Sequence, residues 1–223
     1  MCDVSKCNDL DELFRCWRKA HCDESEKEYK KYGDQFVSKV SFTIDGFIDE
    51  QAYRSQEKRI LLIAKESNEF GKRPNEIQTK KCATGIHFWL SKMVKDGKTN
   101  RFINGLAILC NGLISPESEE PCIDTNVLNN AAFMNINKRA GFSRSDPETI
   151  NGYFCHYMEY IRREFQLIDP THIICCGKGI KELVEKICVN NQNIYESKHP
   201  SMRFLSRKKL LKDFLTSNGL KTE

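Results

Sequence analysis

Three polar residues lie at or near the ends of short apolar runs and carry side chains that can do chemistry. Glu66 follows one such run, Asn135 lies near the end of a second, and His199 comes shortly after a third. A carboxylate can orient a water molecule and stabilise developing positive charge, whereas an amide and a neutral imidazole can donate hydrogen bonds where negative charge develops. The three residue types suit hydrolysis of a bond whose two halves develop opposite charges.

Short apolar runs alternate along the chain with longer amphipathic segments, a pattern typical of a parallel sheet flanked by helices. The predicted strands are residues 60–64, 131–136, 172–176 and 193–195. The predicted helices are residues 86–94, 101–113, 147–165, 180–189 and 203–215. Asp146 and Pro147 are a typical cap and first-turn residue for the third of these helices. Ligands bind beyond the carboxyl ends of such strands, so the candidate residues should converge at one edge.

The sequence therefore predicts one α/β domain, with a central, mostly parallel four-stranded sheet flanked by helices, over residues 51–223. Residues 1–50 are predicted to form a helical N-terminal extension packed on the core, because Leu10, Leu13, Phe14 and Trp17 recur at helical spacing. No repeat or low-complexity linker divides the chain of 223 residues.

Composition restricts the compartment and the cofactors. No apolar run is long enough to cross a bilayer, and Asp3 and Lys6 lie where a signal peptide would be apolar, so we expect an intracellular protein in the cytoplasm or nucleoid. Several of the 11 cysteines lie inside apolar runs, as reduced cysteines do. The first four cysteines are irregularly spaced and do not match zinc or iron–sulfur sites. We therefore predict no metal and no cofactor.

Four motifs occur in a recognisable order. They are Gly85-Ile86-His87-Phe88, Phe133-Met134-Asn135, residues 173–177 and His199-Pro200-Ser201. The order of these motifs resembles that in the uracil-DNA glycosylase superfamily, and the resemblance covers residues 59–215. Members of that superfamily carry a water-activating motif after the first strand and a His-Pro-Ser motif before the last helix.

The resemblance implies a role for each candidate residue. Glu66 would orient the attacking water and stabilise the sugar cation, and His199 would donate a hydrogen bond to the pyrimidine O2. Asn135 would bind the edge of a base extruded from DNA, and Phe88 would stack on it. Each residue also has a structural alternative: a surface glutamate, a structural histidine, an asparagine that satisfies neighbouring backbone groups, or a core phenylalanine.

The sequence departs from the superfamily in the loop that begins at Ala64. Asn68 lies where the uracil-specific branch has a tyrosine that crowds the C5 edge of the base, so the pocket is predicted to admit 5-substituted pyrimidines as well as uracil. Met202 and Arg203 lie where the family inserts a wedge into the duplex. The predicted DNA contacts are Ser201, Met202, Arg203, Lys138 and Lys178.

The resemblance thus implies a monofunctional DNA glycosylase, a monomer that needs no cofactor and acts on single- or double-stranded DNA, in repair or in defence against modified phage DNA. The net charge of +4 is modest, and the basic run from Arg203 to Lys212 supports a DNA partner only weakly. Two alternatives stay open. One is a module that binds modified DNA without cleaving it, and the other is an enzyme that acts on free nucleosides or nucleotides.

Overall fold

The computed structural model describes residues 3–32, 41–68, 85–141, 145–188 and 192–221. The described strands are β1 (Gly46–Phe47), β2 (Ile60–Asn68), β3 (Ala131–Gly141), β4 (His172–Cys176) and β5 (Asn193–Ser197). The described helices before β2 are η1 (Val4–Lys6), α1 (Leu10–Asp23), α2 (Glu26–Tyr32) and α3 (Glu50–Arg54). Those after it are α5 (Ile86–Lys95), α6 (Arg101–Ile114), η2 (Thr125–Asn130), α7 (Pro147–His156), α8 (Met158–Ile168), α9 (Lys181–Val184) and α10 (Arg207–Ser217).

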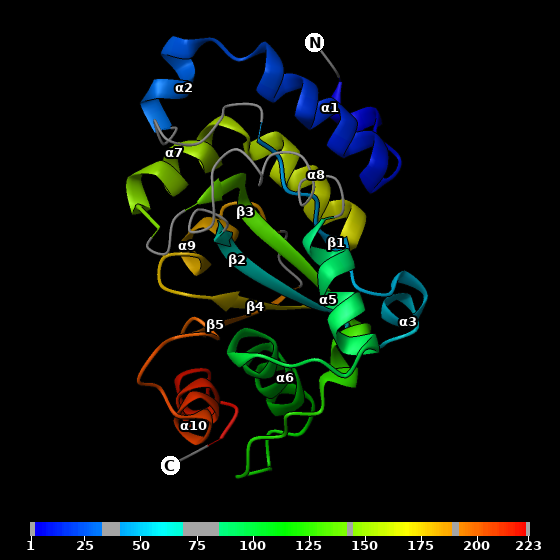
Figure 1. Ribbon diagram of the computed structural model, residues 1–223, viewed down its shortest axis with the longest axis vertical. Helices are drawn as coiled ribbons and strands as arrows, with labels where there is room; N and C mark the ends of the chain where they lie inside the picture. The colour runs from blue at the N-terminus through cyan, green and yellow to red at the C-terminus, as the bar shows by residue number, and fades with distance from the viewer. Residues whose placement is uncertain (1–2, 33–40, 69–84, 142–144, 189–191, 222–223) are drawn as a thin grey trace.

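The strands form one sheet in the order β1-β3-β2-β4-β5 (Figure 1). β2, β3, β4 and β5 are parallel, and β1 pairs antiparallel with β3. The predicted α/β architecture with a mostly parallel sheet is confirmed, but the sheet has five strands and not four. The fifth, β1, is only two residues long, too short for the alternation by which a strand is recognised in a sequence.

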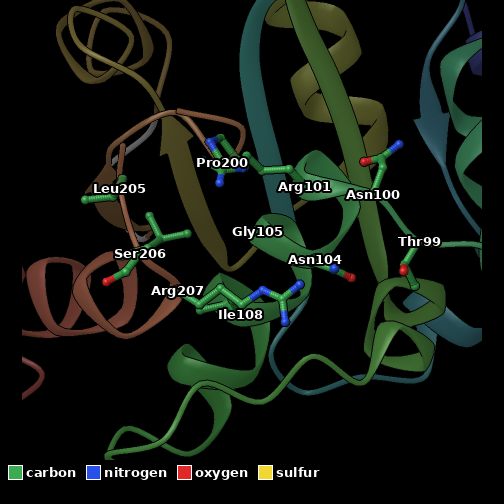
Figure 2. Close-up of a pocket in the computed structure, with 11 residues that line it drawn as sticks. Thr99, Asn100, Arg101, Asn104, Gly105, Ile108, Pro200, Leu205, Ser206 and Arg207 are labelled. Atoms are coloured by element: carbon green, nitrogen blue, oxygen red, sulfur yellow. The ribbon is translucent and has the colours of Figure 1, made fainter. Parts of the chain in front are cut away.

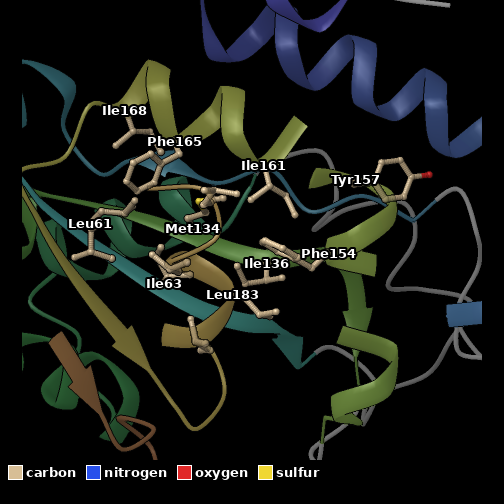
Figure 3. Close-up of a cluster of buried hydrophobic side chains, with 14 of the residues drawn as sticks. Leu61, Ile63, Met134, Ile136, Phe154, Tyr157, Ile161, Phe165, Ile168 and Leu183 are labelled. Carbon is tan, nitrogen blue, oxygen red and sulfur yellow. The ribbon is translucent and has the colours of Figure 1, made fainter. Parts of the chain in front are cut away.

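Each face of the sheet is covered by helices, as Figure 1 shows. Leu61 and Ile63 face a core that also contains residues of α1, α7 and α8 (Figure 3). Leu62 and Ala64 face the opposite core, which contains residues of α5, α6 and α10. Because both faces are buried, the central strands are continuous apolar runs.

The N-terminal helix α1 contributes to the first of these cores. Trp17 is fully buried, and Phe14 lies in the same apolar cluster as the β2 residues Leu61 and Ile63. Asp9 caps the helix by accepting a hydrogen bond from the backbone of Glu12 at 2.8 Å. The apolar residues that recur at helical spacing in the sequence thus form the buried face of α1, which packs against α8 and the sheet.

Several helices differ from their predicted bounds. The segment predicted as one helix over 147–165 is two helices, α7 and α8, separated at Tyr157. The helix predicted over 180–189 is only the short α9. The last helix begins at Arg207 and not at residue 203, because Ser206 accepts a hydrogen bond from the backbone of Lys209 and so caps it there.

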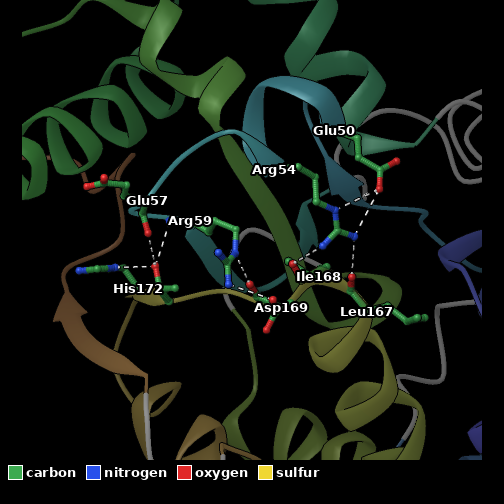
Figure 4. Close-up of polar contacts among 9 residues, drawn as sticks. Glu50, Arg54, Glu57, Arg59, Leu167, Ile168, Asp169 and His172 are labelled. Carbon is green, nitrogen blue, oxygen red and sulfur yellow. Dashed lines mark hydrogen bonds and ion pairs between the residues drawn. The ribbon is translucent and has the colours of Figure 1, made fainter.

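A polar network fixes the amino ends of β2 and β4, far along the strands from the candidate site (Figure 4). The Arg59 backbone donates to Thr171 Oγ1 at 2.9 Å, and its guanidinium donates to the Asp169 carbonyl at 2.7 Å. Arg54 donates to the carbonyl of Leu167 at 2.9 Å, at the end of α8. These contacts set the register of the two strands. No described helix is long and apolar enough to cross a membrane.

Candidate active site

The carboxyl ends of β2 and β3 bring Glu66 and Asn137 side by side as register partners. Asn137 Nδ2 donates to Glu66 Oε2 at 3.1 Å, and Asn137 Oδ1 accepts the backbone N–H of Arg139 at 2.9 Å. The hydrogen bond from Arg139 therefore fixes the orientation of the Asn137 amide, and the Nδ2 group of this amide in turn positions the Glu66 carboxylate. The β2–β3 register shifts directly after Glu66, and pairing resumes between Ser67 and Ala140, so this residue lies beside a bulge.

Gly141 leaves the space that the Glu66 side chain occupies. A Cβ atom at position 141 would overlap the carboxyl group and Cγ of Glu66. The overlap involves the mobile end of a side chain, so the fold can accommodate a methyl group only by moving the carboxylate.

We expect Gly141→Ala to leave the protein folded and to displace Glu66 from Asn137. Any activity that needs a positioned carboxylate should fall by roughly tenfold or more, since small misplacement of a catalytic group is costly. The measurement is initial rate together with the thermal midpoint of unfolding. Gly97→Ala is the control for activity: a Cβ at that glycine meets no atom within 4 Å, and its left-handed φ of 62° means that the variant should lose some stability but no activity. Full activity in Gly141→Ala would show that the position of Glu66 is unimportant.

Asn135 lies two residues before Asn137 on the same face of β3. Its backbone N–H donates to Asp45 Oδ2 at 2.6 Å, and the residue is only 1 % exposed. Among the described residues, neither Oδ1 nor Nδ2 of its side chain has a hydrogen-bond partner. An unsatisfied buried amide costs about 1–3 kcal/mol. The side chain therefore has an unused donor and an unused acceptor in one plane.

His199 lies in the loop between β5 and α10. Its ring stacks on Phe102 of α6, with 5.9 Å between centroids and 27° between planes, and Phe102 in turn meets the edge of Phe133. The Ser201 backbone N–H donates to Nδ1 at 3.3 Å, so Nδ1 is an acceptor and Nε2 carries the proton of the neutral ring. Desolvation of the ring and the positive charge of Lys65 lower the pKa of His199. The imidazole is thus a neutral donor through Nε2 at pH 7.

Close packing against α6 positions the His199 loop. A Cβ atom at Gly105 would lie 2.5 Å from the carbonyl oxygen of Pro200, so only glycine allows this approach. Arg101 Nη1 donates to the Met202 carbonyl at 2.9 Å, and the Met202 N–H donates to the His199 carbonyl at 2.9 Å. The loop is therefore anchored on both sides of Ser201.

Phe204 in the same loop is a residue that the sequence did not single out. Its side chain is fully exposed, and its backbone has a left-handed φ of 66°. Both features are unfavourable for a phenylalanine, and such strain is often found at functional sites. In the sequence Phe204 falls inside the predicted last helix, where an apolar residue needs no explanation. Only the late start of α10 reveals that it projects from a loop.

Lys138 does not contact the surface, so its predicted contact with DNA is wrong. Its side chain is fully buried and donates to Asp45 Oδ1 at 2.6 Å and to Glu164 Oε1 at 2.9 Å. Burial and the charge of Asp45 raise the pKa of Glu164 well above its ordinary value. Arg139 is also buried, in an ion pair with Glu24. The Lys138 ammonium lies over the ring of Trp17 in α1, and the Arg139 guanidinium lies over the ring of Tyr153 in α7.

Ser201 also differs from its predicted place. The sequence predicts it as a DNA contact two residues before a helix over 203–215, but α10 begins at Arg207, and Ser206 is its cap. The Ser201 hydroxyl lies 3.0 Å from His199 Nδ1, so this residue orients the imidazole.

The remaining predicted site residues lie on the surface where they are described. Phe88 is 54 % exposed on α5, which removes the alternative that it belongs to the core. Met202 and Arg203 are exposed in the His199 loop, and Lys178 is exposed in the loop after β4. The side chain of Asn68 lies outside the described residues, and the predicted role of this residue at the C5 edge stays a prediction.

Within the described ranges, no three histidine, cysteine or acidic side chains are grouped as metal ligands would be. Eight described cysteines are free thiols, and Cys16 takes part in a disulfide. The candidate residues thus supply a carboxylate, a buried amide and a neutral imidazole. Neither a scan against known protein-family models nor a comparison with curated protein sequences finds a match to this chain.

Proposed function

We propose that this protein is a monofunctional DNA glycosylase that resembles the uracil-DNA glycosylase superfamily. The observation that carries the proposal is the amide of Asn135, which is buried and has no side-chain partner among the described residues. A planar ligand with a donor and an acceptor on one edge would satisfy it, and the edge of a nucleobase has this pattern. A pyrimidine extruded from DNA is the ligand that we propose.

The other two groups suit cleavage of the N-glycosidic bond. Ala64 of β2 is the register partner of Asn135, and Glu66 comes two residues later on the same strand. Glu66 and Asn135 are therefore offset by about 7 Å along the strand direction. Its carboxylate would orient a water molecule and stabilise the sugar as positive charge develops. His199 would donate through Nε2 to the pyrimidine O2, in a hydrogen bond that strengthens as the base departs with negative charge.

Water is the nucleophile in this proposal. A lysine nucleophile must be neutral to attack, whereas Lys138 is held between the carboxyl groups of Asp45 and Glu164. The proposed products are a free base and an abasic site, and borohydride should trap no covalent complex.

The substrate is proposed as a uracil-like or 5-modified pyrimidine. An amide can turn over to match the opposite donor and acceptor orders of uracil and cytosine, so Asn135 does not by itself select between them. The biological role is proposed as DNA repair or defence against modified foreign DNA.

The test is incubation of the protein with single- and double-stranded oligonucleotides that carry uracil, mismatched thymine or 5-modified cytosine. Mass spectrometry of released bases and alkaline cleavage of the strand are the measurements. Release of a base with formation of alkali-labile sites supports the proposal. Binding without release would instead indicate a DNA-binding module, and release from free nucleosides alone would indicate a nucleosidase.

Phe204 is proposed to fill the gap that the extruded nucleotide leaves in a duplex. We expect Phe204→Asn to lower base release from double-stranded DNA by roughly tenfold and to change release from single strands little, because only a duplex must be unstacked. Asparagine tolerates the left-handed backbone, so the free energy of unfolding should stay equal or rise by about 1 kcal/mol.

The control for this variant is Ile123→Asn, which removes another exposed apolar side chain far along the chain from the loop. Initial rates on matched single- and double-stranded substrates give the comparison. An equal loss on both substrates would contradict a role for Phe204 in opening the duplex.

A further inference from the structure

A cavity of about 370 Å³ lies between the start of α6 and the start of α10, beside the His199 loop (Figure 2). The described residues that line it include two arginines, Arg101 and Arg207, and no acidic residue. Figure 2 shows Arg207 reaching from α10 toward α6. Neither arginine has a carboxylate partner among the described residues. The cavity therefore has an uncompensated positive charge.

Two helix N-termini meet at this cavity. Asn100 caps α6 and Ser206 caps α10, and both residues line the wall. Each cap satisfies the third backbone N–H of its helix, so the N–H groups of the first two residues have no intrahelical partner. The positive ends of two helix dipoles add to the arginine charges and favour an anion.

Asn104 adds a polar side chain to the wall of the cavity. It lines the same cavity and is only 6 % exposed, and its Oδ1 has no hydrogen-bond partner among the described residues. Its amide group can donate through Nδ2 to an anion. A buried amide without a protein partner is stabilised when a ligand provides one.

We propose that this cavity is a binding site for a phosphate group, held by Arg101, Arg207 and Asn104 between the first turns of α6 and α10. Planar guanidinium groups match the oxygen geometry of phosphate, and exposed helical N–H groups bind the same oxygens. The volume admits a phosphate with an attached sugar. The group is carried either by nucleic acid or by a small molecule.

The phosphate site is distinct from the Glu66–Asn135 site. Pro200 lines the cavity, and Arg101 also donates to the Met202 carbonyl, so a bound phosphate would lie against the loop that carries His199. The inference stands on the residues of the cavity and does not depend on base excision.

The test measures affinity of the full chain for three probes at constant ionic strength. The probes are inorganic phosphate, a nucleoside 5′-monophosphate and an oligonucleotide without terminal phosphates. Arg207→Gln is compared with Lys212→Gln, which removes the same charge from an exposed position of the same helix outside the cavity. Asn104→Leu removes the buried amide without a change of charge.

We expect Arg207→Gln to weaken binding at least tenfold for one class of probe and Lys212→Gln to change it less than about twofold. Loss for inorganic phosphate and the monophosphate assigns the site to small-molecule phosphates, whereas loss for the oligonucleotide alone assigns it to nucleic-acid phosphates. Asn104→Leu should weaken binding of the same class of probe severalfold. The proposal is overturned if no probe binds at millimolar concentration, or if Arg207→Gln and Lys212→Gln have equal effects on every probe.

Discussion

Replacing Glu66 by glutamine is expected to lower base release by roughly 100- to 1,000-fold while DNA binding stays intact. Glutamine keeps an oxygen that can accept the hydrogen bond from Asn137, so the local structure should persist. It lacks the negative charge that would orient water and stabilise the sugar cation. The measurement is formation of alkali-labile sites under single-turnover conditions, together with affinity for the same oligonucleotide.

Glu182→Gln is the matched control, since it removes one negative charge from an exposed position on α9. It should release base at the wild-type rate. If Glu66→Gln also releases base at that rate, Glu66 is a surface glutamate and the proposed mechanism is wrong. A loss of binding equal to the loss of rate would indicate that the charge acts on affinity and not on the chemical step.

Replacing Asn135 by leucine, which has a similar shape, is expected to separate function from stability. Base release should fall by about 100-fold, because the hydrogen bonds to the base edge are lost. The free energy of unfolding should stay the same or rise by about 1–3 kcal/mol, because the variant removes a buried amide that has no described partner. Chemical denaturation and initial rates on the preferred substrate measure the two effects.

Asn137→Leu is the comparison, two residues further along the same strand. Its amide holds Glu66 and the backbone N–H of Arg139, so its loss should lower the free energy of unfolding by about 1–3 kcal/mol. If Asn135→Leu destabilises the protein by the same amount, the Asn135 amide has a structural role. The proposal that it reads a base would then fail.

The main elements of the fold could be predicted because their signals are local. Strands such as β4 are buried on both faces and therefore consist of consecutive apolar residues. The start of α7 at Pro147 follows from its cap, Asp146, which accepts hydrogen bonds from the first turn. The break between α7 and α8 and the late start of α10 could not be predicted, since apolar residues continue at helical spacing through both segments.

The proximity of Glu66 and Asn135 could be predicted from the order of the strands, although both residues lie within β2 and β3 and not after them. Glu66 and Asn135 lie at one edge because parallel strands end together. The sequence places Lys138 just after the predicted strand 131–136, where a lysine is ordinarily exposed. Its burial depends on Asp45 and Glu164, which are distant in the sequence and become neighbours only in the folded chain.

The sequence by itself determined the α/β class, the mostly parallel central strands and the chemical types available at their ends, since these depend on hydrophobic periodicity and residue identity. Only the tertiary structure decided that the Asn135 amide is left without a described partner, that Ser201 orients His199, and that two helix N-termini enclose a basic cavity. The physical reason is that hydrogen bonding, burial and charge compensation depend on groups brought together by folding, and no local pattern encodes them.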